Sequence, residues 1–427
     1  MVRHGSKVPV NIRNHMINRA LYLAQASLVG VFLFFPMKLG VANTLLALTL
    51  VLTVISGNFR QRWQAVRDNP ITAPALTMFA LVVVGSTYST GPIETILQSV
   101  NKYSKFLVLL LTVSLLGEQK WRQRCWMAFA AAMLFTLVSV FAGLWTHIPW
   151  AKGPTPSGWG TDHTIFKDYI AQSLLLTTFA AYTITRAFEA QNTHRRLAWI
   201  TAALLAIVST LFLSYGRTGY LAVFCMLTVY AWTVSAKRLR LLALVASATF
   251  VIVGLWSSPS AQSRVGAVFS EAQTQLSSKG GINRLNGETS IGARLSMWAF
   301  SVEQIKERPL LGSGTGSYGS LARASCGERS DCDVISYHPH NQFLFFGVEL
   351  GLIGLFAFCY YLYVAAKASA ALAPPRQALL LSFLAIFVVD SLVHGALWLA
   401  VENHLFTFIL ALLMAEVSAA REKATRA

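Results

Sequence analysis

The side chains of this sequence that are best suited to chemistry gather in one stretch, residues 290–354. Arg294 lies near its start, the glycine-rich run 312–316 in its middle, and the motif His-Pro-His-Asn at residues 338–341 near its end. Arginine binds phosphates and carboxylates through two parallel hydrogen bonds. Imidazole, with a reference pKa of about 6.5, can accept a proton at neutral pH. The stretch therefore predicts a site that holds an anion and removes a proton from a second reactant.

Two arginines have surroundings that favour anion binding. Arg217 lies in the tight turn Ser-Tyr-Gly-Arg-Thr-Gly at residues 214–219, which leaves no room for a freely exposed loop; the alternative is that Arg217 extends to lipid headgroups. Arg294 falls in the first turn of a predicted helix, where the helix dipole repels cations unless an anion joins them. A diphosphate held by the arginine and by free backbone N–H groups would meet that condition. The alternative for Arg294 is a surface ion pair with Glu288 or Glu303.

His338 and His340 flank Pro339 directly before a long apolar run. A single histidine at a membrane border is more often structural than catalytic. Two histidines that are fixed by a proline and followed by Asn341 favour a role in proton transfer. We expect one of the two to be a general base, and the residues alone leave open which one.

Three lysines near the predicted outer ends of apolar runs are further candidates for anion binding. Lys102 and Lys105 lie three residues apart on one predicted helix face, where they either bind an anion or extend to the headgroups. Lys167 begins another apolar run and either joins them or pairs with its neighbour Asp168.

Other ionisable side chains near the ends of apolar runs are expected to pair with each other, because a charge in a membrane is costly and usually has a partner. Asp390 is expected to pair with His394, one helical turn further on. Glu402 is expected to pair with His404. We therefore predict a structural role for these four residues.

The glycine-rich run 312–316 resembles a phosphate-binding loop. It lacks the lysine and the following Ser or Thr that such a loop carries. We interpret it as a tight connection whose backbone could approach a substrate.

Composition identifies the chain as a membrane protein. Hydrophobic residues make up 55% of the 427 residues and charged residues 12%, whereas soluble domains carry about 25% charged residues. The apolar runs are continuous, about 17–25 residues long and without a period of two, which selects helices over a barrel. We predict an all-α polytopic membrane protein with about twelve transmembrane helices.

The expected spans divide the chain into three parts. Residues 1–257 hold the first nine spans, 258–340 form one large segment with an amphipathic helix, and 341–427 hold the last three spans and a tail. In the amphipathic helix, Ser290 to Lys306, residues Ile291, Leu295, Trp298 and Val302 recur on one face. The twelve runs are 20–36, 40–56, 72–87, 94–116, 125–146, 166–186, 197–214, 218–235, 240–257, 341–366, 377–395 and 403–418.

The distribution of cations predicts the orientation. Of the 35 lysines and arginines, 21 fall in segments on the side that holds both termini. By the positive-inside rule, both termini are then cytoplasmic and the segment 258–340 is periplasmic. The net charge of +17 does not indicate nucleic-acid binding, because the cations lie in short loops at alternate ends of the apolar runs and form no basic soluble module.

Cys326 and Cys332, two of the five cysteines, flank Gly-Glu-Arg-Ser-Asp in this periplasmic segment. A bacterial periplasm is oxidising, so a short-loop disulfide is the natural expectation. A zinc pair, with His338 and His340 nearby, is the alternative. The other three cysteines lie in or beside apolar runs and are expected to be packed there as small hydrophobic side chains.

Several of these motifs resemble one known family. His340-Asn341, followed after nine residues by Gly351-Leu-Ile-Gly354, resembles a pattern of bacterial O-antigen ligases and O-antigen polymerases. The resemblance extends from about Leu197 to Phe356. The His-Pro-His-Asn form, the chain length and the single large periplasmic segment favour the ligases of lipopolysaccharide biosynthesis within this superfamily. The other motifs that carry the resemblance are Arg294…Trp298…Arg308-Pro-Leu-Leu-Gly-Ser-Gly and the turn Ser-Tyr-Gly-Arg217.

The resemblance implies a glycosyltransferase of the bacterial inner membrane. Such an enzyme transfers O-antigen glycan from undecaprenyl diphosphate to a sugar hydroxyl of lipid A–core oligosaccharide at the periplasmic face, among membrane lipids. Because the diphosphate is already a good leaving group, we expect no cofactor and no obligatory metal, only cations to hold it and a base for the acceptor. Direct attack by the acceptor would invert the anomeric centre, since no carboxylate is placed to form a glycosyl-enzyme intermediate.

Roles follow for the candidate residues. Arg217 and Arg294 are expected to hold the diphosphate, with Lys102, Lys105 and Lys167 as further cations. His340 is expected to be the base, because it precedes Asn341 at the spacing that the family pattern has and lies nearer the helix start. His338 is the alternative base.

Three alternatives remain. An O-antigen polymerase would commonly have two large periplasmic loops with paired arginines, and a protein O-oligosaccharyltransferase of the same superfamily is generally longer. A transporter or flippase for an anionic lipid-linked solute could line its pathway with the same arginines. The position of the polar block at a membrane border, rather than at mid-depth, argues against a transporter.

Overall fold

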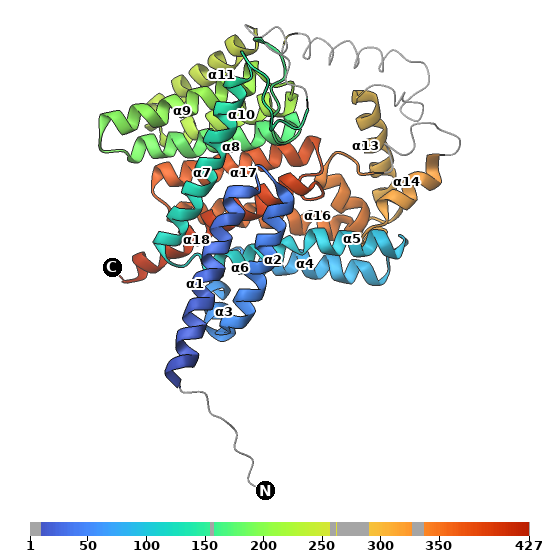
Figure 1. Cartoon of the computed structure of the whole chain (residues 1–427). Helices are drawn as coiled ribbons and strands as arrows, with labels where there is room; N and C mark the ends of the chain where they lie inside the picture. The colour runs from blue at the N-terminus through green and yellow to red at the C-terminus, as the bar shows by residue number, and fades with distance from the viewer. Residues whose placement is uncertain (1–9, 154–157, 257–261, 263–289, 327–336, 427) are drawn as a thin grey trace.

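The structure of the protein, a computed structural model, describes residues 10–153, 158–256, 262, 290–326 and 337–426. Within these ranges the chain forms helices and loops without a strand (Figure 1). The α-helices are α1 Val10–Phe34, α2 Leu39–Ser56, α3 Phe59–Arg67, α4 Thr72–Thr87, α5 Ile93–Tyr103, α6 Lys105–Leu115, α7 Gln119–Ala142, α8 Tyr169–Glu189, α9 Thr193–Phe212, α10 Arg217–Val234, α11 Arg240–Trp256, α13 Ser290–Glu307, α14 Tyr318–Cys326, α16 Gln342–Ala368, α17 Pro374–Val393 and α18 Ala400–Arg426.

The all-α class predicted from the apolar runs is confirmed for the described residues. Each predicted span coincides with a helix, except that the run 94–116 is divided into α5 and α6 at Ser104. Seven described helices are long and apolar enough to cross a membrane: α1, α2, α7, α9, α16, α17 and α18. The helices α3 and α4, bent by 106° at a short break, could form an eighth span. The chain is a multi-pass membrane protein, and the count of twelve spans stays a prediction.

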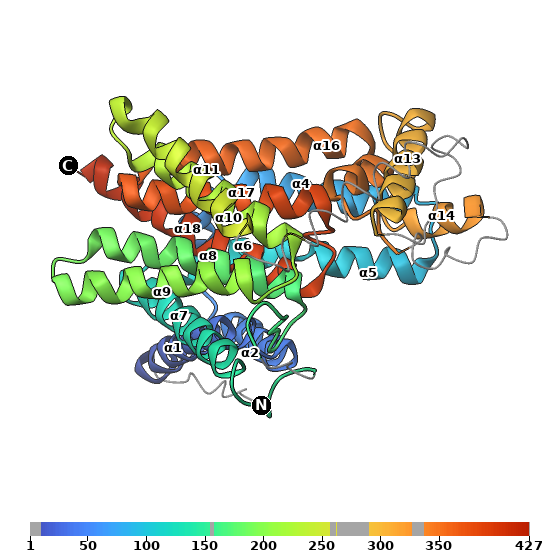
Figure 2. The same ribbon diagram turned by 90° about the horizontal axis from the view of Figure 1, so that it is seen from above.

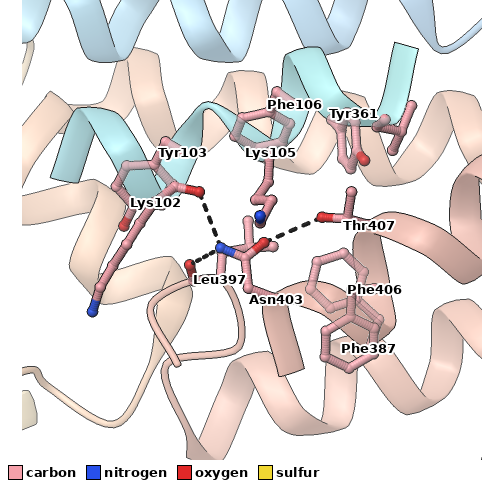
Figure 3. A pocket seen from close by; sticks show the side chains of 11 residues that line it. Lys102, Tyr103, Lys105, Phe106, Tyr361, Phe387, Leu397, Asn403, Phe406 and Thr407 are labelled. Atoms are coloured by element: carbon pink, nitrogen blue, oxygen red, sulfur yellow. Dashed lines mark hydrogen bonds between the residues drawn. The ribbon is translucent and has the colours of Figure 1, made fainter. Parts of the chain in front are cut away.

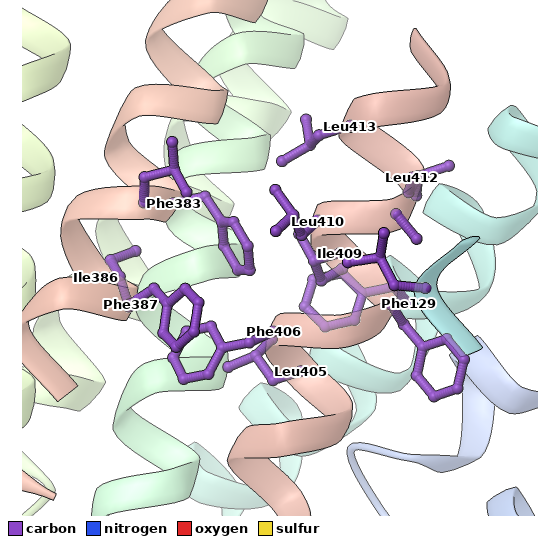
Figure 4. Close-up of a cluster of buried hydrophobic side chains, with 14 of the residues drawn as sticks. Phe129, Phe383, Ile386, Phe387, Leu405, Phe406, Ile409, Leu410, Leu412 and Leu413 are labelled. Carbon is purple, nitrogen blue, oxygen red and sulfur yellow. The ribbon is translucent and has the colours of Figure 1, made fainter. Parts of the chain in front are cut away.

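The helix α18 lies at the centre of the bundle. In its most apolar window 78% of the residues are buried, the highest share among the seven described helices that could span a membrane. Figure 4 shows Phe406 of α18 beside Phe383 and Phe387 of α17, while Phe129 of α7 lies on the other side of α18. Aromatic rings fill this interface, with those of Phe387 and Phe406 stacked at 4.1 Å between centroids. These contacts hold α7 and α17 around one buried helix.

The helix α16 is broken at Gly351, where φ is 65° and ψ is −163°. The break frees backbone N–H groups, and the loop after α13 supplies acceptors for two of them: Leu352 N donates to Pro309 O at 2.7 Å and Ile353 N to Leu310 O at 3.4 Å. A Cβ at position 351 would lie 2.2 Å from Leu310 O, so only glycine allows this approach. The first glycine of the pattern Gly351-Leu-Ile-Gly354 is therefore explained by backbone packing.

The glycine-rich run 312–316 continues this packing. Its backbone donates to α16, from Gly314 N to Glu349 O at 2.8 Å and from Gly316 N to Glu349 Oε1 at 2.9 Å. On its other side Thr315 N donates to Gly85 O of α4 at 3.1 Å. The run is a tight connection, as predicted, but these contacts direct its backbone toward neighbouring helices and not toward an open site.

The helix α13 exists where the sequence predicted it and ends directly before Arg308-Pro309. Figure 2 shows α13 and α14 at one end of the molecule, beside the start of α16. The apolar face noted in the sequence is not uniformly buried, because Val302 is 41% exposed, whereas Met297 and Ser301, which lie off that face, are buried. The helix packs closely on α16, where a Cβ on Gly347 would lie 2.5 Å from Ile305.

About half of the predicted periplasmic segment, including Cys332, lies outside the described residues, and so does the predicted disulfide between Cys326 and Cys332. Of the other cysteines, Cys125 is buried as expected. Cys225 is half-buried, and Cys359 is exposed and does not pack as predicted.

We expect Gly351→Ala to destabilise the protein strongly. The new methyl group would collide with Leu310 O, and the left-handed φ of 65° adds strain for any L-residue. Together these effects should cost at least about 2 kcal/mol, seen as a lower thermal midpoint in detergent. The matched control is Gly40→Ala at the start of α2, where a Cβ meets nothing within 4 Å. Equal midpoints for the two variants would contradict the proposed role of the helix break.

Candidate functional site

Three imidazole rings form a cluster at one end of the bundle. His338 and His340 precede α16, and His394 follows the last residue of α17. Ring centroids are 4.1 Å apart for His338 and His340, 5.3 Å for His340 and His394, and 6.0 Å for His338 and His394. The structure thus brings the two predicted histidines together and adds a third that was expected to have only a structural role.

Hydrogen bonds from three directions fix the segment around His340. Trp298 of α13 donates from Nε1 to Pro339 O at 3.0 Å. His340 N donates to His338 Nδ1 at 3.1 Å. Asn341 caps α16 by accepting from Leu344 N at 3.0 Å and donates to Leu392 O of α17, also at 3.0 Å. Asn341 therefore acts as a structural link between α16 and α17.

His340 has a left-handed backbone, with φ of 48°. Few non-glycine residues adopt this conformation, and when they do the surrounding structure must hold them there. Its ring is partly accessible, unlike that of His338, which is 2% exposed. Strain of this kind concentrates at functional sites, which favours His340 over His338 as the ring that meets a substrate.

Burial keeps both of these histidines neutral. Burial, together with the neighbouring histidines, Lys102 and Arg294, lowers the pKa of His338 to about 2. Burial also lowers the pKa of His340 to about 3, helped by His394 and Arg294. A neutral ring can accept a proton, but a base with so low a pKa is weak until an anion approaches and raises it.

His394 faces two buried carboxylates. Its Nδ1 lies 3.5 Å from Asp390 Oδ1 and 3.8 Å from Glu402 Oε1, and both acids are almost fully buried. Burial alone would lower the pKa of His394, but the hydrogen bond and charge of Asp390, with the charge of Glu402, raise it overall. The predicted Asp390–His394 pair is confirmed, and Glu402 makes it a group of three.

The predicted pair of Glu402 and His404 is wrong. Residues two apart on a helix point in different directions, about 200° around the axis. Glu402 faces His394, whereas His404 contacts Asn43 Oδ1 of α2 through Nε2 at 2.8 Å. His404 therefore links α18 to α2 and lies outside the histidine cluster.

Lys102 and Lys105 do not share a helix face as predicted, because the helix is interrupted at Ser104. Figure 3 shows their ammonium groups pointing in different directions. Lys102 Nζ lies 3.6 Å from the ring centre of Trp398, and its charge acts on His338. Both lysines line one pocket, with Asn403 and apolar side chains. The charge of Lys102 acts on His338 of the cluster, whereas that of Lys105 acts on His404.

Lys167 precedes α8 and is 8% exposed. Burial, with a smaller contribution from Lys152, lowers the pKa of Lys167 to about 8, although Asp168 and Glu402 act in the opposite direction. Asp168 acts on Lys167 only through its charge, since its Oδ1 caps α8 by accepting from the backbone N of residues 170 and 171 at 3.0 Å each. Because Glu402 influences both Lys167 and His394, Lys167 lies beside the histidine cluster.

The two arginines reach this end of the bundle from different elements. Arg294 lies one helical turn before Trp298 on α13, and its charge lowers the pKa of His338 and His340. Arg217 is the first residue of α10, half-buried, in a turn that packs on α8 through a contact of Ser214 Oγ with Tyr169 O at 3.4 Å. The side chain of Arg217 makes no ion pair with any described residue.

The described residues contain no group of three or more His, Cys, Asp or Glu side chains arranged to hold a metal ion. The zinc alternative for Cys326 and Cys332 falls outside the described ranges. The spacing of Asp390 and His394 in an apolar run was the only sequence signal for the third histidine. Glu402 carried no such signal, because it comes from another helix.

The fold and the site define a helical membrane protein with a cationic, histidine-containing cluster at one end. Residues 200–359 match the family described as O-antigen ligase. This segment contains Arg217, Arg294, His338 and His340 and is similar to the O-antigen ligase/polymerase superfamily. The superfamily resemblance noted in the sequence is thereby confirmed.

A relative is found in Haemophilus influenzae, strain Rd. The two chains are 26% identical over 191 residues, which is 43% of this chain and 46% of that protein. The chain therefore spans about half the length of the curated relative that it matches. That protein is described only as uncharacterized, so it adds no reaction.

Burial of neutral His338 predicts acid sensitivity. A histidine in the unfolded chain has a pKa of about 6.5, so stability from the neutral buried ring is present above that pH and is lost as pH falls toward the folded pKa of about 2. At pH 5 the loss is about 2 kcal/mol. We expect the thermal midpoint of wild type to fall more between pH 8 and pH 5 than that of His338→Gln. The exposed His194 gives the control variant, His194→Gln, which should follow wild type.

Proposed function

We propose that the chain is an O-antigen ligase. It would transfer O-antigen glycan from undecaprenyl diphosphate to lipid A–core oligosaccharide at the periplasmic face of the inner membrane, with both termini in the cytoplasm. The observation that carries the proposal is the hydrogen bond from Trp298 to Pro339 O, at 3.0 Å, inside the matched family segment. It joins the helix of Arg294 to the two histidines, so an anion-binding group and a proton acceptor meet at one place.

The proposed reaction assigns the diphosphate to the cations. Arg294 and Arg217 bind its oxygens as guanidinium forks, and Lys167 and Lys102 add positive charge. Lys105 lines the same pocket as Lys102, but its charge acts on His404 and not on the histidine cluster, so it is left out of this assignment. As the bond between the anomeric carbon and the diphosphate breaks, the leaving group carries away the electron pair and negative charge develops, which these cations stabilise.

His340 is the proposed base for the acceptor. It takes the proton of the sugar hydroxyl while the hydroxyl oxygen attacks the anomeric carbon from the side opposite the diphosphate, so the centre inverts. The diphosphate beside it raises the pKa of the ring and makes it a stronger base than in the empty site. We assign His394 a positioning role, because its ring stacks on His340 at 5.3 Å and its Nδ1 lies within 4 Å of the acidic side chains of Asp390 and Glu402, which hold the ring in place.

Two other functions use the same elements. An O-antigen polymerase would share the donor chemistry and differ only in taking a second lipid-linked glycan as its acceptor. A transporter of an anionic lipid-linked solute is disfavoured by the position of the cluster, because His340 and His394 lie at the ends of α16 and α17 and not at mid-helix.

The first test is transfer in vitro, with undecaprenyl diphosphate-linked O-antigen as donor and purified lipid A–core as acceptor. We expect wild type to produce ligated product and His340→Ala to lose about 10²–10⁴ in rate while still binding the donor. His338→Ala should be milder, since its buried ring faces His340. Product formed only from two donor molecules would identify a polymerase instead. Normal transfer by both histidine variants would refute the general-base mechanism.

The second test concerns the arginines. Arg217→Ala and Arg294→Ala should each remove most transfer while thermal stability stays near that of wild type. Replacement by lysine should restore activity only in part, because a point charge cannot reproduce a bidentate contact with phosphate. Arg124→Ala, an exposed arginine near the start of α7, is the control and should be fully active. Full activity of either site variant would assign that arginine to headgroup or surface contacts.

A further inference from the structure

A second polar cluster lies at the opposite ends of the helices that form the histidine site. Arg376 is near the start of α17, and His394 follows the last residue of this 20-residue helix. At 1.5 Å per residue the two are about 27 Å apart along the helix, close to the hydrocarbon thickness of about 30 Å. The second cluster therefore lies at the other membrane border, at the level of the lipid headgroups.

Ion pairs join three helices in this cluster, and a hydrogen bond adds a fourth. Arg376 of α17 donates from Nη2 to Glu189 Oε2 of α8 at 2.7 Å and from Nη1 to Glu416 Oε1 of α18 at 3.2 Å. Trp126 of α7 donates from Nε1 to the same Glu416 oxygen at 2.8 Å. Arg186 Nη1 contacts Glu189 Oε2 at 3.0 Å. Because Arg376 is largely buried and its partners surround it, this part of the cluster is structural.

A groove of about 570 Å³ opens beside these ion pairs, between α7, α8, α17 and α18. Its apolar lining includes Trp126 and Tyr182, whose rings stack at 4.4 Å between centroids. Its other walls carry side-chain amides and the guanidinium groups of Arg122 and Arg186. A groove with an aromatic surface and a cationic rim at this depth fits a molecule that is both apolar and anionic.

The lining of the groove has one positive charge in excess. Three arginines and two glutamates line the groove, and Arg376 forms ion pairs with both glutamates. Arg122 donates to Leu116 O at 2.8 Å at the end of α6, and no described carboxylate lies within ion-pair distance of it. The Nε of Arg186 is buried and donates to no acceptor in the described part of the chain. The groove therefore has charge and hydrogen-bonding capacity that the protein itself does not satisfy.

We propose that this groove binds an anionic phospholipid, phosphatidylglycerol, through the phosphodiester of its headgroup. Arg122 and Arg186 would contact the phosphate, the rings of Trp126 and Tyr182 would pack on the glycerol backbone, and the acyl chains would extend along the lipid-facing side of α7. One negative charge balances the excess positive charge of the lining, whereas a zwitterionic headgroup leaves it uncompensated. The site is independent of the proposed ligase reaction, because it lies at the other membrane border.

The test is lipid binding by the full chain in detergent, measured by native mass spectrometry with phosphatidylglycerol, phosphatidylethanolamine and inorganic phosphate as separate probes. We expect phosphatidylglycerol to bind wild type more tightly than phosphatidylethanolamine. Arg186→Gln should weaken phosphatidylglycerol binding about tenfold, the value of one charge-assisted contact. Arg124→Gln, which removes a charge two residues from Arg122 but outside the groove, should change binding less than about twofold.

Each other outcome overturns the proposal. Equal loss in Arg186→Gln and Arg124→Gln would mean that binding follows net charge and not this groove. Binding of inorganic phosphate as tight as that of the lipid would identify a site for free anions. Equal affinity for phosphatidylglycerol and phosphatidylethanolamine would show that the groove does not select an anionic headgroup. If Arg186→Gln fails to fold, Arg122→Gln on α7 is compared with Arg124→Gln in the same binding experiment.

Discussion

The backbone hydrogen bonds at the break in α16 hold together the part of the structure on which the candidate site depends. Leu352 N and Ile353 N would lack acceptors inside a membrane, and Pro309 and Leu310 supply them. The same contacts anchor the loop after α13, so α13 cannot separate from α16 without exposing these groups. Since α13 carries Arg294 and the indole that binds Pro339 O, the position of the arginine relative to the histidines follows from this one packing arrangement.

The sequence predicted the helices and part of the site for physical reasons that are local. Long apolar runs have one stable conformation in lipid, so the helices could be located to within a few residues. The break at Ser104 was missed, because no proline or glycine marks it. The apolar periodicity of α13 did not indicate which residues are buried, since packing on α16 buries Ser301 and leaves Val302 of the apolar face exposed.

The candidate site was predictable only where its residues are neighbours in sequence. His338, His340 and Arg294 were found from local motifs, and the pair of Asp390 and His394 from helical spacing. That His394 also faces Glu402 and stacks on His340 depends on how α16, α17 and α18 pack together. Glu402 and His404 show the same limit, because their separation by two residues places them on different faces, and only the fold decides which partner each one meets.

The central position of α18 bears on how the protein is made. This helix is among the most buried of the bundle, yet the ribosome synthesises it after every other described helix. Until α18 inserts, the faces of α7, α8 and α17 that will contact it are exposed to lipid. During this time His394 can contact Asp390 but not Glu402, because Glu402 is part of α18. Completion of the bundle is therefore a late, post-insertion event, in which a helix enters a preformed gap instead of adding to an edge. A protein built in this order should depend on the membrane-insertion machinery to hold its unfinished intermediate.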